Sequence, residues 1–569
     1  MGMRSRFFVV LFFMVLFSTL GFSDVVLEED RQRATEAQEQ SLIFQRKLLD
    51  RTLQDRERAD RERAKARIKV ESESGDVVDG DVPQFNIDHI VVEGVTLFSA
   101  RKINRLKKPY EHRLLNQNDI SLLIRSITSL YLDKGYITSR AYLPVQNLKS
   151  GELKVSVLEG KVSRVEFSGS QSQNVALWTA FPEMRGKILN IRRIEQGLDQ
   201  LNRVGSRRSV MTLLPDPEIS GATVVQINSE VGNPYSIRFQ YDNLAPTQVY
   251  PRQLIIGRDH LLKINDVWQL SLSQDAGDLG NQNKSLGLNI SFPLRWATIS
   301  SSYSHFEYSN LIQGGSGNFS SSGETRSTGL ELDWILFRNQ ISKYALTMGM
   351  TVKSTDSFIE DTRNDVGSRT LAVASIGLDQ EWRTSMGMWS LEAAFYQGVT
   401  GFDATHDLEG LDNEAPRAQF QKEKITISGY KPFKVWQIPM TYRLVSELQH
   451  SPHTLYGSER LAIGDEFTVR GFRGGVVQGD VGAYLRQDLG IPISKIFASS
   501  NLRLNLGLDA GMARARGGKD LSVIGSSVGV FWTFGALSLD LTIGMPISAS
   551  EQAGDYESEF YFRGSFQVL

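Results

Sequence analysis

The C-terminal part of the chain, residues 234–569, alternates apolar and polar residues in one segment after another, and this period of two constrains the fold more than any other feature. The segment "SLGLNISFPL" places apolar residues at every second position from Leu286 to Leu294, with Gly, Asn and Ser between them at first. "ALSLDLTIGM" repeats the pattern from Leu537 to Met545. Successive side chains of a strand point to opposite faces, so each segment predicts a strand with one apolar and one polar face.

Such strands could belong to a soluble sandwich or to a membrane barrel. The segments are about ten residues long, which is the length that crosses a bilayer at a tilt. Their polar face is rich in small and charged residues, as a water-filled lumen requires, and the last segment contains several aromatic residues. In lipid every backbone group must pair internally, so the sheet must close. Residues 233–569 therefore predict a transmembrane β-barrel of about 16 antiparallel strands.

The first 23 residues have the features of an export signal. Arg4 and Arg6 form a positive start, an apolar segment runs from Phe7 to Leu20, and small residues precede a cleavage position after Ser23. The alternative is an N-terminal membrane anchor, but the apolar segment is shorter than the ~20 residues that a spanning helix needs. We expect residues 1–23 to be a signal peptide.

Residues 24–69 predict a charged helix, because opposite charges recur three or four positions apart. Few of its residues are apolar, so it cannot bury much surface against a core. It is either a solvated or partly disordered helix, or a helix in a watery environment. Residues 70–84 are acidic, contain glycine and predict a flexible linker.

A duplicated unit follows the linker. In residues 85–160 a strand, "FNIDHIVVEG", is followed by a helix over Asn118–Asp133 and by two further strands. Residues 161–232 repeat this order, with the helix over Ile191–Val204. A Leu-Pro pair closes the same strand in both copies. Two α+β units in tandem explain the pattern.

Several kinds of chemistry are not supported. The formal net charge of −2 argues against nucleic acid as a partner, and the absence of cysteine excludes a thiol nucleophile and a cysteine-zinc site. Gly525–Gly529 matches the esterase pattern G-x-S-x-G, but it lies in an alternating strand instead of a strand-turn-helix. His450 and His453 are separated by a proline in a turn. We predict no catalytic residue, no metal and no cofactor.

Two α+β repeats before a barrel that contains "VRGF" (469–472) resemble the POTRA-barrel outer-membrane superfamily. Two repeats preceded by a charged helix and a linker resemble the two-partner secretion transporters, which are related to haemolysin and haemagglutinin activators. "KGYITSRAYLPVQNLKSGELKVSVLEG" (134–160) is similar to the end of the first POTRA domain in that family. The resemblance implies periplasmic POTRA domains at 85–160 and 161–232, and a helix at 24–69 that could plug the pore.

The resemblance also implies that the loop carrying V-R-G-F folds back into the lumen, where its arginine pairs with an aspartate on the inner wall. The loop residues here are Val469, Arg470, Gly471 and Phe472. In "NLRLNLGLDAG" (501–511) the leucines share one parity, so Asp509 should face the lumen. Asp488, in "AYLRQDLG", is the second choice, and Gly507 stands where the family often has an aromatic residue. The alternative is a surface loop with a solvated arginine.

This resemblance implies a translocation pore in the outer membrane that secretes an unfolded partner exoprotein, such as an adhesin, a cytolysin or a contact-dependent toxin. The POTRA domains would recognise the partner, outer-membrane lipid would surround the barrel, and the barrel assembly machinery would insert it. The alternatives are an insertase that moves other barrel proteins sideways into lipid and a barrel enzyme such as a lipase.

Overall fold

In the computed structural model, the described residues are 84–169, 174–244, 251–275, 282–314, 317–365, 367–493, 500–551 and 556–568. The expected signal peptide, charged helix and linker up to residue 83 lie outside them. None of the helices in the described ranges combines the length and apolarity that a membrane-spanning helix requires.

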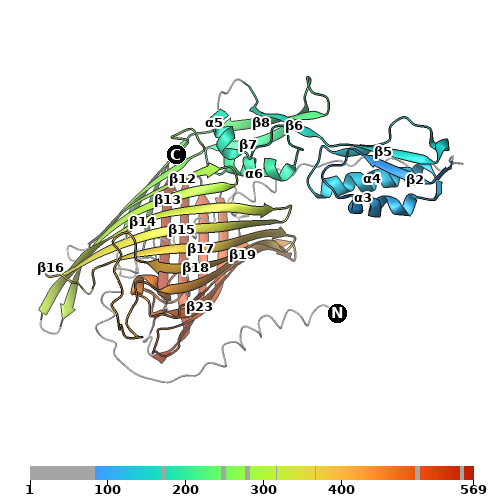
Figure 1. The fold of residues 1–569 in the computed structure, drawn as a ribbon. Coiled ribbons are helices and arrows are strands. Elements are labelled where there is room, and N and C mark those ends of the chain that lie inside the picture. The colour runs from blue at the N-terminus through green and yellow to red at the C-terminus, as the bar shows by residue number, and fades with distance from the viewer. Residues whose placement is uncertain are drawn as a thin grey trace.

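The described part of residues 233–569 forms one closed antiparallel barrel of sixteen long strands, which confirms the predicted fold class (Figure 1). Each strand pairs with its neighbour in sequence, and β27 pairs with β9 to close the sheet. This closing seam spans Arg563–Gln567 on β27, whereas β13 pairs with β14 over Ala297–Gly314. The two-residue strand β16 (Thr362–Arg363) extends the pairing of β15.

The barrel strands have the following bounds: β9 Tyr235–Asp242, β10 Pro251–Asp259, β11 Val267–Asp275, β12 Gln282–Leu294, β13 Ala297–Gly314, β14 Gly317–Arg338, β15 Ser342–Ile359, β17 Arg369–Thr384, β18 Gly387–Val399, β19 Gln421–Val435, β20 Ile438–His450, β23 Val481–Pro492, β24 Ser500–Arg514, β25 Leu521–Phe534, β26 Leu537–Ala549 and β27 Glu559–Gln567.

The alternation sorts side chains between the membrane face and the lumen. On β24, Leu508 is 54% exposed on the outer face while the next residue, Asp509, is 1% exposed inside. Leu330 on β14 and Leu378 on β17 are likewise exposed on the outside. An apolar outer face that continues around a closed sheet is typical of a surface in contact with lipid.

The first α+β unit packs two helices against small sheets. Its elements are β1 Phe85–Ile87, β2 His89–Glu93, α3 Ala100–Lys107, η1 Lys108–Tyr110, β3 Arg113–Leu115, α4 Gln117–Asp133, β4 Arg140–Tyr142, η2 Leu148–Ser150 and β5 Glu152–Leu158. The single strand expected at 85–94 is interrupted at Asp88, because the amides of Asp88 and His89 both bind the Gly151 carbonyl at 2.8 and 3.2 Å. β1 then pairs with β3, and β2 pairs with β5.

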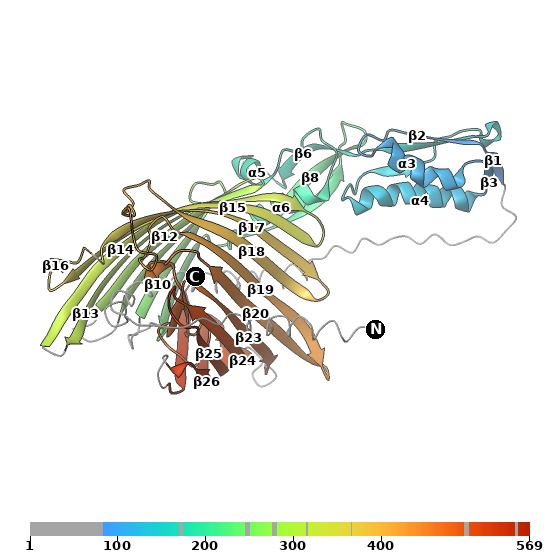
Figure 2. The same ribbon diagram turned by 60° about the horizontal axis from the view of Figure 1, so that its bottom comes forward.

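The second α+β unit has the same plan, with elements β6 Lys161–Phe167, α5 Asn174–Ala180, α6 Ile191–Leu201, β7 Arg207–Pro215 and β8 Ala222–Val231. It lies between the first unit and the barrel, as both ribbon views show (Figure 2). Helices α5 and α6 contact the barrel turns at this end. The Arg295 amide donates to the carbonyl of Thr179 on α5 at 2.6 Å, and the side chain of Gln196 on α6 donates to the Arg295 carbonyl at 3.0 Å.

Candidate functional site: a loop anchored inside the barrel

The connection between β20 and β23, residues 451–480, begins at the barrel end away from the α+β units and folds back into the lumen. It contains the turn η3 (Gly457–Glu459) and a short hairpin of β21 (Leu461–Ile463) and β22 (Val477–Gly479). Phe472 and Val469 at the hairpin tip are completely buried together with Ile463. The inner walls of β23 to β27 surround this tip, so the loop occupies part of the barrel interior.

Arg470 binds two carboxylates of the wall. Its Nε and Nη2 donate to the two oxygens of Asp509 at 2.7 and 2.8 Å, which is the bidentate geometry of a guanidinium and a carboxylate. Its Nη1 donates to Asp488 at 2.5 Å, and Nη2 also donates to the Gln487 carbonyl at 3.1 Å. The Arg470 amide adds a bond to Asp509 at 3.2 Å.

The structure therefore places the predicted partner, Asp509, and the second choice, Asp488, on the same arginine. Arg470 is 3% exposed and Asp509 is 1% exposed, so this charge cluster is removed from water. Buried charges are costly unless they are paired and hydrogen-bonded, and here all three guanidinium nitrogens have an acceptor.

Gly471 and Phe472 hold the loop tip against β26 and β27. Gly471 has φ 98°, a left-handed conformation that favours glycine, and a β-carbon there would lie 2.6 Å from the Met545 carbonyl carbon. Its amide donates to the Tyr561 hydroxyl at 3.1 Å, and that hydroxyl donates to the Phe472 carbonyl. The Phe472 ring packs edge-on against Tyr556 at 4.9 Å between centroids.

Glycines on the wall leave room for this tip. A β-carbon at Gly507 would overlap the Arg470 guanidinium, and one at Gly525 would overlap the Arg470 carbonyl oxygen. A β-carbon at Gly544 would overlap the Gly471 amide nitrogen, and one at Gly511 would lie 2.6 Å from the Ile463 side chain and 3.1 Å from that of Val469. Gly507, which departs from the aromatic residue often found in related sequences, is thus the position where the guanidinium lies.

A second anchor holds the other end of the loop, and sequence reasoning did not predict it. Glu459 of η3 is buried and its two carboxylate oxygens bind Lys353 of β15 at 2.7 Å and Lys422 of β19 at 2.8 Å. The only signal in the sequence is indirect: Lys422 and Lys424 lie on the luminal parity of "QKEKITIS" and need anionic partners. Lys424 finds Glu447 at 3.1 Å.

Other residues considered from the sequence do not form a chemical site. Ser527, the central serine of the G-x-S-x-G match, lies inside the continuous strand β25. His450 binds Glu423 at 2.9 Å, while His453 accepts the Gln421 amide at 3.1 Å, so the two histidines have different partners.

Within the described ranges, one group could offer three ligands to a metal: His305, Glu307 and Glu324, on the outer face of β13 and β14. The guanidinium of Arg326 already lies 2.5 Å from Glu324. Exposed side chains that are neutralised in this way form ordinary ion pairs, and we assign no metal to them.

Comparison with known proteins identifies the family of this chain. Residues 221–532 match the family described as "Haemolysin secretion/activation protein ShlB/FhaC/HecB". The chain belongs to this family. Residues 85–160 match the "POTRA domain, ShlB-type" and residues 161–215 match a second POTRA domain.

Similar curated proteins are transporters. The chain is 28% identical over 473 residues to "Outer membrane transporter CdiB" of Escherichia coli, covering 82% of this chain and 79% of that protein. It is 28% identical over 446 residues to "Hemolysin transporter protein ShlB" of Serratia marcescens, covering 78% and 77% respectively. The solved structure "CdiB from Escherichia coli" superimposes with a TM-score of 0.86 at 25% identity, covering 96% of this chain and 100% of that one.

The family and the barrel place this protein in the outer membrane, with its two POTRA domains in the periplasm. It is an outer-membrane transporter of the two-partner secretion type. The barrel end that carries the POTRA domains is therefore the periplasmic end, and the loop of residues 451–480 enters the lumen from the extracellular end.

Proposed function

We propose that the barrel conducts one unfolded, secreted partner protein from the periplasm to the cell exterior, and that the loop of residues 451–480 closes the pore at rest. The observation that carries the proposal is the buried contact of Arg470 with Asp509 and Asp488, since it holds a folded hairpin across the lumen. The cargo would be an adhesin, a cytolysin or a contact-dependent toxin. The protein would act as a conduit without catalysing a reaction or holding a cofactor.

In this proposal the POTRA domains catch an extended segment of the partner by adding it to a sheet edge. At three sheet edges, backbone groups on the outer side of the edge strand already form hydrogen bonds with other parts of the domain. On β2, Lys107 and Glu111 bind Ile90, and on β6, Lys187 and Gly186 bind Val162. On β4, Thr128 accepts the Ala141 amide.

The remaining edge of the two three-stranded sheets is β7 of the second POTRA domain. Asn202 binds the backbone of Ser209 near its start. Between Val210 and Leu214, the backbone groups on the side of β7 that faces away from β8 form no hydrogen bond within the described ranges. The side chains of Val210 and Leu214 are exposed. This part of β7 is the best candidate for pairing with cargo, since an open edge with apolar side chains can bind an extended chain.

The proposal also covers the parts of the chain that lie outside the described residues. Residues 1–23 would be removed after export, residues 24–69 would plug the pore, and residues 70–84 would be their linker. Insertion into the outer membrane would depend on the barrel assembly machinery, and nucleic acid would not take part.

The decisive experiment compares a strain lacking this protein with its parent by mass spectrometry of culture supernatant and outer membrane. The expected result is the loss of one large secreted protein with an unchanged set of outer-membrane proteins. An unchanged supernatant with missing barrel proteins would instead support the insertase, which is the alternative function.

A further inference from the structure

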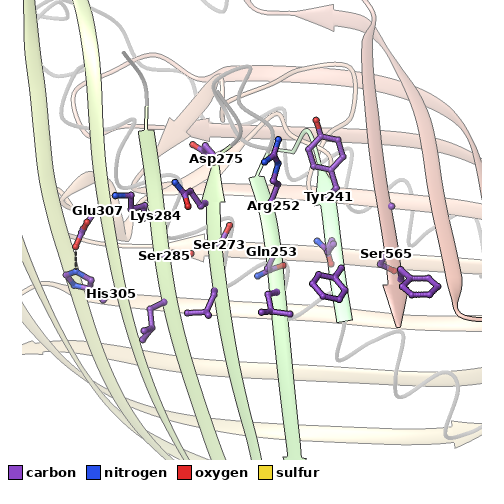
Figure 3. Close-up of a pocket in the computed structure, with 18 of the residues that line it drawn as sticks. Tyr241, Arg252, Gln253, Ser273, Asp275, Lys284, Ser285, His305, Glu307 and Ser565 are labelled. Carbon is purple, nitrogen blue, oxygen red and sulfur yellow. Dashed lines mark hydrogen bonds and ion pairs between the residues drawn. The ribbon is translucent and has the colours of Figure 1, made fainter. Parts of the chain in front are cut away.

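The outer face of the barrel next to its closing seam has a groove with a volume of about 1060 Å³. It runs over β27, β9, β10, β11, β12 and β13, and Figure 3 shows the residues that line it. Its lower wall is apolar: Phe239, Leu272 and Leu286 are 50%, 38% and 36% exposed, respectively. These side chains face lipid, so the groove opens toward the membrane and not toward the lumen.

Cross-strand register divides the groove into two rows. One row is apolar and joins Phe566, Phe239, Leu254, Leu272 and Leu286 across five strands. The next row on the extracellular side is polar.

The polar row joins Tyr241, Arg252, Gln274, Lys284 and Glu307 across the five strands from β9 to β13. A step of two residues changes the wall from leucine to a charged side chain on β10 and β12, and from an apolar side chain to Tyr241 and Gln274 on β9 and β11. This amphipathic profile matches a lipid, whose acyl chains meet the headgroup over a similarly short distance.

The polar row contains two cations, Arg252 and Lys284, whose side chains have no partner within the part of the chain that the structure describes. Arg252 and Lys284 are both exposed, and neither forms a hydrogen bond or an ion pair there. Glu307 lies opposite Lys284 in the ladder, but its carboxylate is bound to His305 at 2.8 Å (Figure 3). The polar row contains two cations and one carboxylate, so its net charge is positive and an anion is a natural partner for Arg252 and Lys284.

We propose that this groove binds one phosphate-bearing lipid of the outer membrane beside the barrel seam. The phosphate lies between Arg252 and Lys284, and the acyl chains cover the apolar row from Phe566 to Leu286. Guanidinium and ammonium groups both bind phosphate well, and each basic residue near a membrane surface strengthens the attraction to an anionic lipid. The bound lipid would lie across the short ladder of β27 and β9.

The test is native mass spectrometry of the purified full-length protein, titrated with phosphatidic acid in detergent. We expect the unaltered protein to retain one lipid. The double variant Arg252→Gln/Lys284→Gln should bind that lipid about 10- to 30-fold more weakly, because two favourable charge contacts are lost. The double variant Lys431→Gln/Lys434→Gln on β19, on the opposite side of the barrel, makes the same charge change and should bind as the unaltered protein does. Heat-dependent gel mobility checks that all three barrels are folded.

Two further arms identify the ligand. Diacylglycerol with the same acyl chains should bind more weakly than phosphatidic acid, and inorganic phosphate alone should not displace the lipid. Equal binding of phosphatidic acid by the unaltered protein and the groove variant would overturn the proposal. Displacement of the lipid by inorganic phosphate at equal concentration would also overturn it, since the apolar row would then contribute nothing.

Discussion

Arg470 shows how one buried side chain can determine the position of a whole loop. A guanidinium presents its donors in a rigid plane, so it can bind Asp509 with two nitrogens and Asp488 with the third. A lysine has the same charge but concentrates it at one flexible point. It could approach one carboxylate well but could not reproduce this geometry.

We therefore expect Arg470→Lys to lower the free energy of barrel unfolding by about 3 kcal/mol, because breaking a buried ion pair leaves a carboxylate without its partner. The temperature at which the folded band disappears in heat-dependent gel mobility should fall, and secretion should decrease. Arg473→Lys is the control in the same loop, since its partner Glu559 is partly exposed. Equal losses in the two variants would show that bidentate binding is unimportant.

Glu159 in the first POTRA domain likewise holds a loop in place through its hydrogen bonds. Its carboxylate accepts hydrogen bonds from the Thr96 amide at 2.8 Å and the Tyr131 hydroxyl at 2.7 Å. Burial alone would raise the pKa of Glu159, but hydrogen bonds from Thr96, Tyr131 and Leu97 outweigh it, and the pKa lies below its ordinary value of 4.5. The folded domain therefore favours the ionised carboxylate.

This pKa shift predicts a pH dependence with a definite sign. Because the folded-state pKa is lowered, the contribution of Glu159 to stability is present above pH 4.5 and is lost as the pH falls through the folded-state value. Hydrogen exchange of residues 94–98 in the full-length protein should accelerate more on acidification than in Glu159→Gln, which lacks the titrating group. Parallel behaviour of the two proteins would exclude Glu159 as the cause.

At the scale of the loop, the two anchors act on different walls. Arg470 ties the hairpin tip to β23 and β24, and Glu459 ties the start of the loop to β15 and β19. The loop therefore spans the lumen between two walls. Complete displacement of the loop would break the ion pairs of both Arg470 and Glu459.

Removal of the second anchor should free the start of the loop and partly widen the pore, while Arg470 still holds the tip and the barrel stays folded. In Glu459→Gln the ammonium groups of Lys353 and Lys422 lose their buried counter-charge, at a cost of about 3 kcal/mol. We expect a larger conductance in planar lipid bilayers. Glu423→Gln is the control, because Glu423 is exposed on the same strand as Lys422. Unchanged conductance in Glu459→Gln would mean that the tip contact alone holds the loop.

At the scale of the whole molecule, the second POTRA domain is docked on the periplasmic turns of the barrel. Arg338 at the end of β14 binds Asp199 of α6 at 2.7 Å and Gln196 at 3.1 Å. The Gln196 side chain also donates to the Arg295 carbonyl at 3.0 Å. These contacts fix the orientation of the second POTRA domain, and with it the proposed cargo-binding part of β7, relative to the barrel.

Arg338→Gln should loosen this docking. Hydrogen bonds to charged groups are worth about 1.5–3 kcal/mol, so hydrogen exchange in α6 should accelerate about tenfold while the barrel strands remain unchanged. Lys187→Gln removes an exposed ion pair within the same POTRA domain and should have little effect. If α6 exchanged at the original rate in Arg338→Gln, the ion pair would not hold the interface.

The sequence alone determined the architecture, because the lipid-facing and luminal sides of the strands appear in it as alternating apolar and polar residues. The period of two predicted the barrel, and parity along β24 placed Asp509 inside. The sequence signals for individual helices in the POTRA domains were weaker. Helix α3, for example, was not predicted, since Ile103 is its only buried residue and most of the others are charged or polar.

Only the tertiary structure decided which luminal groups meet. Asp488 and Asp509 share one arginine because β23 and β24 are paired in a particular register, and Glu459 meets Lys353 and Lys422 because a closed sheet brings distant strands around one lumen. The groove beside the seam likewise exists only once β27 pairs with β9. Periodicity specifies the face of each residue, but register and closure specify its neighbours, and those depend on the sum of weak contacts over the whole sheet.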